Sequence, residues 1–322
     1  MTNLPNIAAQ PTNRRATRWL TGLCATLLAV ALNGCGGGTV HDPFVPTKIV
    51  AMGDNLAVTT SNARYSVNVS TGEIMTSVEQ LAASYGLSSA LTSTASVNAK
   101  VAATTSFASS AVPLTTQIAN YSSTIGTKDL FVLSAGTVDI IDEFRYGSKS
   151  TTVVTNAAAN FVSGVQTLIG RGAKRILVVP PYDLSITPWG KSLSSSDQIT
   201  LQNLVTTFRD QLKAKLALAG VDGRVVVYVD QELEMNYIVN NNSLSLSDVV
   251  TPVCGTAAND SLNGIGLGTG QLNSSLCTGS TLITVSSATA DPAQYAFADM
   301  VYPTPVVNRD LGTAMYSTTS SR

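Results

Sequence analysis

The chain has 322 residues, which is long enough for one large or two modest domains with a substantial buried core. Charged residues make up only 12% of the sequence and the formal net charge is −1, so no basic surface exists to neutralise the phosphates of a nucleic acid. We therefore expect no nucleic-acid partner. The polar positions are filled largely by serine, threonine and asparagine, which favours an exported protein.

The N-terminal segment has the pattern of an export signal. Arg14, Arg15 and Arg18 precede an apolar run over residues 19–32, which is followed by Cys35 and three glycines. As a helix this run would be about 21 Å long. The hydrocarbon core of a bilayer is ~30 Å thick, so a permanent membrane span is the weaker interpretation.

The residues around Cys35 resemble a bacterial lipoprotein signal, in which a peptidase cuts before a cysteine that carries acyl chains. The resemblance implies a signal peptide over residues 1–34, a lipidated linker over residues 35–46, and attachment to a membrane through Cys35. Gly36 follows in place of the aspartate that in enteric bacteria favours the inner membrane. The resemblance thus points to the outer membrane, with the protein facing the periplasm or the cell surface. A buried thiol at Cys35 is the alternative.

Cys254 and Cys277 are the cysteines that would remain outside the signal and the lipid anchor. They enclose a segment rich in glycine, asparagine and serine that has no helical or strand period. In an oxidising compartment this pattern predicts a disulfide that closes the segment, with two free thiols as the alternative. His41 is the only histidine and no short cysteine spacing exists, so we expect no metal site and no cofactor.

The rest of the chain alternates between two kinds of segment. Short apolar runs that end in turn signals predict buried parallel strands over residues 48–52, 130–133, 175–179 and 225–229. Segments of helical period predict helices over residues 73–85, 114–121, 156–169 and 197–218. The alternation predicts a three-layer α/β domain over residues 47–322, with a loop-rich insertion near residues 240–290.

Polar residues follow the ends of the predicted strands, where parallel sheets bind ligands. The first strand ends in Gly-Asp-Asn-Leu over residues 53–56, and the second is followed by Gly-Thr-Val-Asp over residues 136–139. Between them, residues 98–104 read Asn-Ala-Lys-Val-Ala-Ala-Thr. Near the C-terminus, residues 299–304 read Asp-Met-Val-Tyr-Pro-Thr.

In this order the four segments resemble the sequence blocks of the GDSL or SGNH hydrolases, over roughly residues 47–315. The resemblance implies the SGNH hydrolase fold, with a flavodoxin-like parallel sheet, and the activity of serine esterases and lipases. The family's blocks carry a serine, an oxyanion-binding glycine, an asparagine and a histidine. This chain has Asn55, Ala102, Val138 and Tyr302 at those positions, and retains the family's aspartate as Asp299.

These replacements remove the nucleophile, an oxyanion donor and the general base of the family's mechanism. Asn55 has no hydroxyl to deprotonate and cannot form an acyl-enzyme. Val138 replaces an amide donor whose loss costs roughly 3 kcal/mol of transition-state stabilisation. Tyrosine has an ordinary pKa of about 10, so Tyr302 is expected to stay protonated at neutral pH. His41 lies before the first strand, at the wrong edge of the sheet. We therefore expect no catalytic residues.

Structural roles are expected for the acidic residues at the strand ends. Asp54 would cap the turn after the first strand, and Asp139 would cap the helix after the second. Asp299 would accept hydrogen bonds from the backbone or from Tyr302.

Three functions stay open. The preferred one is a lipid-anchored binding or scaffold module of the cell envelope that has lost ester hydrolysis and holds an acyl, ester or carbohydrate ligand. The residues expected to line its ligand pocket are Asp54, Asn55, Val138, Asp299 and Tyr302. The second function is an ester hydrolase with an unconventional site. The third is a structural envelope protein whose partner binds the segment between Cys254 and Cys277.

Overall fold

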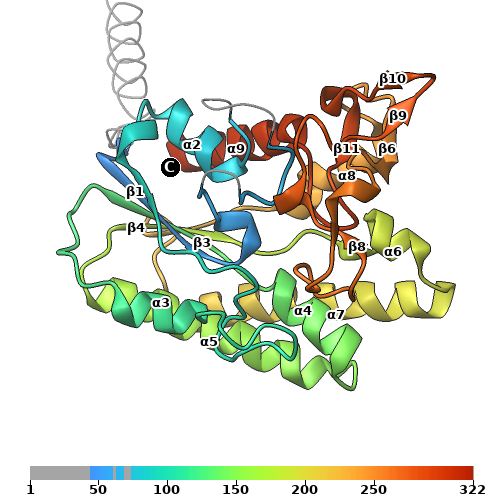
Figure 1. Cartoon of the computed structure of the whole chain (residues 1–322). Helices are drawn as coiled ribbons and strands as arrows, with labels where there is room; N and C mark the ends of the chain where they lie inside the picture. Colours follow the sequence, from blue (N-terminus) through green and yellow to red (C-terminus); the bar gives the residue numbers. More distant parts are fainter. Residues whose placement is uncertain (1–43, 61–62, 69–73, 322) are drawn as a thin grey trace, which may run out of the picture. The chain divides into compact units, whose positions relative to one another are not determined.

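A computed structural model describes residues 44–60, 63–68 and 74–321 (Figure 1). The predicted signal peptide, the predicted lipidation site Cys35 and His41 lie outside these residues. Within the described part of the chain, no helix is long and apolar enough to cross a membrane.

Five parallel strands form the central sheet. They are β1 (Lys48–Gly53), β2 (Leu91–Ser93), β3 (Asp129–Ser134), β4 (Arg175–Val179) and β5 (Val226–Tyr228). Their order is β2-β1-β3-β4-β5, which is that of flavodoxin-like sheets. The predicted α/β class with a parallel sheet is confirmed. The sequence prediction missed β2 because this edge strand has only three residues, two of them polar.

Helices cover both faces of the sheet because side chains alternate along each strand. Val50 and Met52 of β1 belong to the core beneath α3 (Leu114–Asn120), α5 (Thr151–Gly170) and α7 (Ser195–Leu218). Ile49 and Ala51 belong to the core beneath α2 (Ser77–Ser84) and α9 (Pro305–Ser320). Figure 1 shows these two helical layers on opposite sides of β1, β3 and β4. The three-layer prediction is therefore confirmed.

The predicted helices correspond to α2, α3, α5 and α7, with differences at their ends. α2 begins later than predicted, at a capping box in which Thr76 and Glu79 satisfy each other's backbone N–H groups. α5 begins earlier than predicted, at Thr151. The sequence pattern missed this start because the first three residues of the helix are exposed and carry no apolar period. Three further helices are α4 (Thr137–Tyr146), α6 (Pro188–Ser192) and α8 (Gln231–Asn241).

The insertion after α8 consists of loops and very short strands. These strands are β6 (Asp248–Pro252), β7 (Asn259–Asp260), β8 (Gln271–Leu272), β9 (Thr284–Val285), β10 (Ala288–Thr289) and β11 (Tyr295–Phe297). They pair as β11-β6, β7-β8 and β10-β9. The predicted disulfide is present: Cys254 and Cys277 are bonded, with their Cα atoms 5.9 Å apart.

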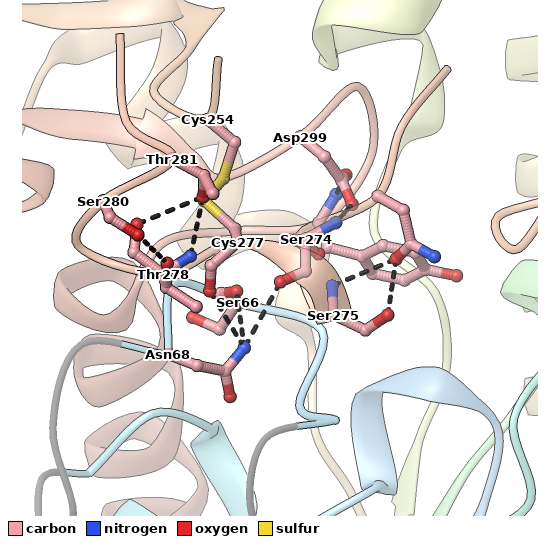
Figure 2. Close-up of a disulfide and its surroundings, with 12 residues drawn as sticks. Ser66, Asn68, Cys254, Ser274, Ser275, Cys277, Thr278, Ser280, Thr281 and Asp299 are labelled. Atoms are coloured by element: carbon pink, nitrogen blue, oxygen red, sulfur yellow. Dashed lines mark hydrogen bonds between the residues drawn. A yellow bond between two sulfur atoms is a disulfide. The ribbon is translucent and has the colours of Figure 1, made fainter. Parts of the chain in front are cut away.

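Asn68 fastens the disulfide-bonded segment to the rest of the domain (Figure 2). Its backbone N–H donates to the carbonyl oxygen of Cys277 at 2.9 Å, and its side-chain amide donates to the carbonyl oxygens of Ser274 and Cys277 at 3.3 Å. The Ser274 N–H in turn donates to Asp299 at 2.8 Å. Ser274 therefore links the disulfide-bonded segment to the turn that carries Asp299 and Tyr302.

Replacing both Cys254 and Cys277 with serine is expected to lower the free energy of unfolding by about 3 kcal/mol. The reason is that the cross-link joins residues 23 positions apart and restricts the unfolded chain. Urea unfolding of the oxidised wild type and the double variant measures the difference. A reductant should shift the wild type toward the variant and leave the variant unchanged; equal midpoints without reductant would contradict the prediction.

Candidate functional site

The candidate site lies at the carboxyl ends of β1 and β3. β1 ends at Gly53, which has φ +134°, and a Cβ at this position would overlap the carbonyl oxygen of Ser134 in β3. Only glycine permits this close approach. The Asp54 N–H then donates to the Ser134 carbonyl at 2.8 Å, and the chain turns at Asp54 and Asn55, both fully buried.

Asn55 is the centre of a buried hydrogen-bond network. Its Nδ2 donates to the Tyr302 hydroxyl at 2.7 Å and to the Asn98 Oδ1 at 3.1 Å. Its Oδ1 accepts the backbone N–H of Asn98 at 2.5 Å. Asn98 has φ +58°, a left-handed conformation that asparagine adopts more readily than most residues. Both N–H groups and the oxygen of the Asn55 amide are thus occupied.

Tyr302 is the aromatic residue of this network, at the position where the sequence resemblance leads one to expect a histidine. Its ring is fully buried and packs edge-on against Tyr65, with ring centroids 4.9 Å apart. Burial, together with the nearby carboxyl groups of Asp54 and Asp299, raises the pKa of Tyr302 well above 10. The phenol therefore stays protonated at neutral pH and is unsuited to act as a general base.

Asp299 is fully buried and accepts hydrogen bonds from the backbone. Its Oδ1 accepts the N–H groups of Val301 and Tyr302 at 2.8 and 2.7 Å, and its Oδ2 accepts the N–H of Ser274. Burial raises the pKa of this carboxyl group. The expected backbone role of Asp299 is confirmed, and it includes the contact to the disulfide-bonded segment that the sequence did not predict.

Two further buried carboxyl groups belong to Asp54 and Asp139. The Oδ1 of Asp54 accepts the N–H of Leu56 at 3.3 Å, as expected for a cap, whereas its Oδ2 has no hydrogen-bond partner among the described residues. Burial, together with the neighbouring Asp139 carboxyl group, raises the pKa of Asp54 from 3.8 to about 7. Burial likewise raises the pKa of Asp139 to about 7.

The expectation that Asp139 caps the helix after β3 is wrong. The capping position of α4 is Gly136, which has a left-handed backbone and no side chain to accept a hydrogen bond. Asp139 lies in the first turn of α4, and its side chain accepts the N–H of Val101 at 3.0 Å. Asp139 therefore holds the loop after β2 against α4.

The structure does not bring all of the predicted positions together. Val138 is buried at the start of α4, beside the Asp54 carboxyl group. Ala102, by contrast, is exposed, and no described contact joins it to Asn55. The residue that meets Asn55 is Asn98, at the opening of the same sequence block. Asn98 opens a block that the sequence analysis singled out, but its contact with Asn55 depends on the path of the loop after β2.

The insertion contacts this site through Tyr65. The Tyr65 hydroxyl donates to the carbonyl oxygen of Gly264 at 3.1 Å, and Ile265 and Leu267 are buried in the same core cluster as Tyr302. The five residues expected to line a ligand pocket, Asp54, Asn55, Val138, Asp299 and Tyr302, are at most 1% exposed. None of them lines either of two cavities, of about 700 and 550 Å³, found elsewhere in the domain. Among the described residues, no group of histidine, cysteine and acidic side chains is arranged to hold a metal ion.

Comparison with known proteins gives a family match over most of the chain. Residues 49–312 match the family described as GDSL-like Lipase/Acylhydrolase. A search of curated proteins finds no match. Among solved structures, 29 chains match. One is the acetyl xylan esterase AlAXEase, with a TM-score of 0.44, 12% identity, and coverage of 84% of this chain and 98% of that chain. Another, titled "a putative arylesterase" from Agrobacterium tumefaciens str. C58, has a TM-score of 0.44, 14% identity, and coverage of 84% and 96%.

Proposed function

The chain belongs to the GDSL-like lipase/acylhydrolase family, and from that premise we propose that it is a non-catalytic member, acting as a binding or scaffold module in the cell envelope. The observation that carries the proposal is the Asn55 network. An amide occupies the place of the nucleophile, and its polar atoms are engaged by Asn98 and Tyr302 in a fully buried environment. The Asn55 side chain has no hydroxyl or thiol that could form an acyl-enzyme.

Attachment to a membrane through Cys35 is part of the proposal. Its support is the arginine cluster, the short apolar run and the glycine-flanked cysteine of the N-terminal sequence. A lipid anchor would hold the domain at the envelope surface, where a binding module acts on ligands or partners delivered to the membrane.

An ester hydrolase with an unconventional site is the alternative, and one observation favours it. The pKa of Asp54, about 7, is close to the value suited to a general base at neutral pH. Against this, Asp54 is fully buried, its neighbour Asn55 is not a nucleophile, and Tyr302 stays protonated. A base that activates water would also need a path for substrate to reach it.

Ester hydrolysis by the full-length, detergent-solubilised protein tests the proposal. Short- and medium-chain p-nitrophenyl esters are incubated with the wild type, with Asn55→Ala and with Asp54→Asn. We expect all three to match a blank prepared from cells that lack the protein, because Asn55 is not a nucleophile and the carboxyl groups beside it are fully buried. A fluorophosphonate probe, which labels activated serines, is expected to leave the wild type unmodified.

Hydrolysis by the wild type that is lost in Asp54→Asn would overturn the proposal and support water activation by this carboxylate. Hydrolysis that all three proteins share, with covalent labelling, would also overturn it and place a nucleophile elsewhere. The test does not require Asn55→Ala to be as stable as the wild type, because the hydrolysis rate of each protein is compared with the blank separately.

A further inference from the structure

A cavity of about 700 Å³ lies between the edge strand β2 and helix α3. The loop after β2 forms one wall, with Thr94, Ser96 and Val97 lining the cavity, while Asn98 of the same loop binds Asn55. The cavity is therefore a neighbour of the candidate site but is built from other residues. Its volume lies within the range of small-molecule sites, about 300–1,000 Å³.

One cation lines this cavity. Lys48 Nζ donates to the Tyr121 hydroxyl at 3.0 Å and lies 5.5 Å from the centre of that ring. This hydrogen bond raises the pKa of Lys48, so its side chain is charged at neutral pH. An ammonium group has three donors, and one of them is engaged by Tyr121.

Within the described residues, no acidic side chain lies in ion-pair contact with Lys48. The carboxyl group of Asp129 also raises the pKa of Lys48, but it accepts the N–H of Gly126 at 2.9 Å and is not paired with the ammonium group. A partly buried cation with spare donors is suited to an anionic ligand group.

The walls offer two further kinds of contact. The side chains of Thr94, Asn120, Ser122 and Ser123 line the cavity and have no hydrogen-bond partner within the described part of the chain. Val97 and Val112 add an apolar surface and are 39% and 38% exposed. Hydroxyl and amide groups beside an apolar patch match a ligand whose ring carries hydroxyls at its edge and C–H groups on its face.

We propose that this cavity binds a hydroxylated carboxylic acid of the size of a uronic acid. The carboxylate pairs with Lys48, the ligand hydroxyls bond to the unpaired hydroxyl and amide side chains, and the C–H face of the ring packs on Val97 and Val112. This site is independent of the proposed function, because it uses none of the residues of the buried Asn55 network.

Isothermal titration of the full-length protein with three probes tests the proposal. Glucuronate carries the ring, the hydroxyls and the carboxylate; glucose lacks the carboxylate; cyclohexanecarboxylate lacks the hydroxyls. We expect glucuronate to bind at least tenfold more tightly than either of the other two. Lys48→Met should weaken glucuronate binding at least tenfold, whereas Lys48→Arg should retain most of it. Asn236→Ala, in the 550 Å³ cavity, is the matched control and should bind as the wild type does.

Absence of saturable glucuronate binding would overturn the proposal. So would equal affinity of the wild type and Lys48→Met, provided both unfold at the same urea midpoint, or an equal loss in Asn236→Ala. Cyclohexanecarboxylate binding as tightly as glucuronate would show that the hydroxyl contacts are absent. Ester hydrolysis by the wild type would overturn the proposed function and leave each of these outcomes unaffected, so the two failures are distinguishable.

Discussion

Replacing Tyr302 with alanine is expected to lower the free energy of unfolding by about 3–5 kcal/mol, the usual cost of removing a large buried aromatic side chain. The ring is fully buried, packs against Tyr65, and accepts a hydrogen bond from Asn55. Truncation would leave both a cavity and an unsatisfied buried N–H. Urea unfolding of the full-length wild type and variant measures the loss.

Tyr237 provides a matched control because its side chain is 48% exposed on α8. Tyr237→Ala is expected to change the free energy of unfolding by less than about 1 kcal/mol. If Tyr302→Ala costs no more than Tyr237→Ala, the region around Tyr302 is an open cleft, and the proposal of a closed, non-catalytic site loses its structural basis. Tyr302→Phe is expected to lie between them, because it keeps the ring and removes only the acceptor for the Asn55 amide.

The central sheet was predictable because its strands are continuous apolar runs. Ile49, Val50 and Ala51 are buried on both faces, so each position of β1 carries the same signal and the strand is easily seen in the sequence. β2 has no such signal, because its residues are Leu91, Thr92 and Ser93. It is held in the extended conformation by its pairing with β1. An edge strand this short is defined by its neighbour, which a sequence pattern does not contain.

The candidate site was predictable in its chemistry but not in its packing. Asn55, Tyr302 and Asp299 were expected at one site, and the structure brings Asn55 and Tyr302 into hydrogen-bond contact. The role of Asn98 instead of Ala102 depends on the loop after β2, which is held by the bond from Val101 to Asp139 and by the ion pair of Lys100 with Asp142 at 2.8 Å. These contacts join residues about 40 positions apart.

Closure of the site was not predictable either. The contacts of the insertion with the site come from Gly264 and Ser274, which lie in a segment with no helical or strand period. An aperiodic segment gives no indication of the surface on which it will pack. The disulfide at Cys254 and Cys277 was visible in the sequence, but its link to Asp299 through Ser274 was not.

The free energy of unfolding is expected to fall as the pH rises from about 4 to about 7, because the pKa values of Asp54 and Asp139 are both raised from 3.8 to about 7 in the folded protein. Over this window the folded state holds more protons than the unfolded state, so raising the pH favours unfolding; above it the dependence levels off. For one carboxyl group, this rise in pKa corresponds to about 4 kcal/mol.

Asp54→Asn should remove one part of this dependence. An amide in place of the carboxyl group carries its own cost at the α4 N-terminus, where backbone N–H groups of Thr137 and Val138 face Asp54, but that cost does not change with pH. The test is therefore the difference in stability between variant and wild type, measured by urea unfolding at pH 4 and pH 8. Between pH 4 and pH 8, we expect the free energy of unfolding of Asp54→Asn to rise relative to that of the wild type by up to about 4 kcal/mol.

Asp222→Asn is the control of opposite sign. Asp222 is exposed, and its hydrogen bonds to Arg224 lower its pKa, so its charged form stabilises the folded state above the pKa of the unfolded chain. The free energy of unfolding of Asp222→Asn should fall slightly relative to that of the wild type as the pH rises. A constant difference between Asp54→Asn and the wild type from pH 4 to pH 8 would mean that Asp54 does not titrate in this window. Its carboxyl group would then be charged at neutral pH through contacts stronger than the N–H groups of Leu56, Thr137 and Val138.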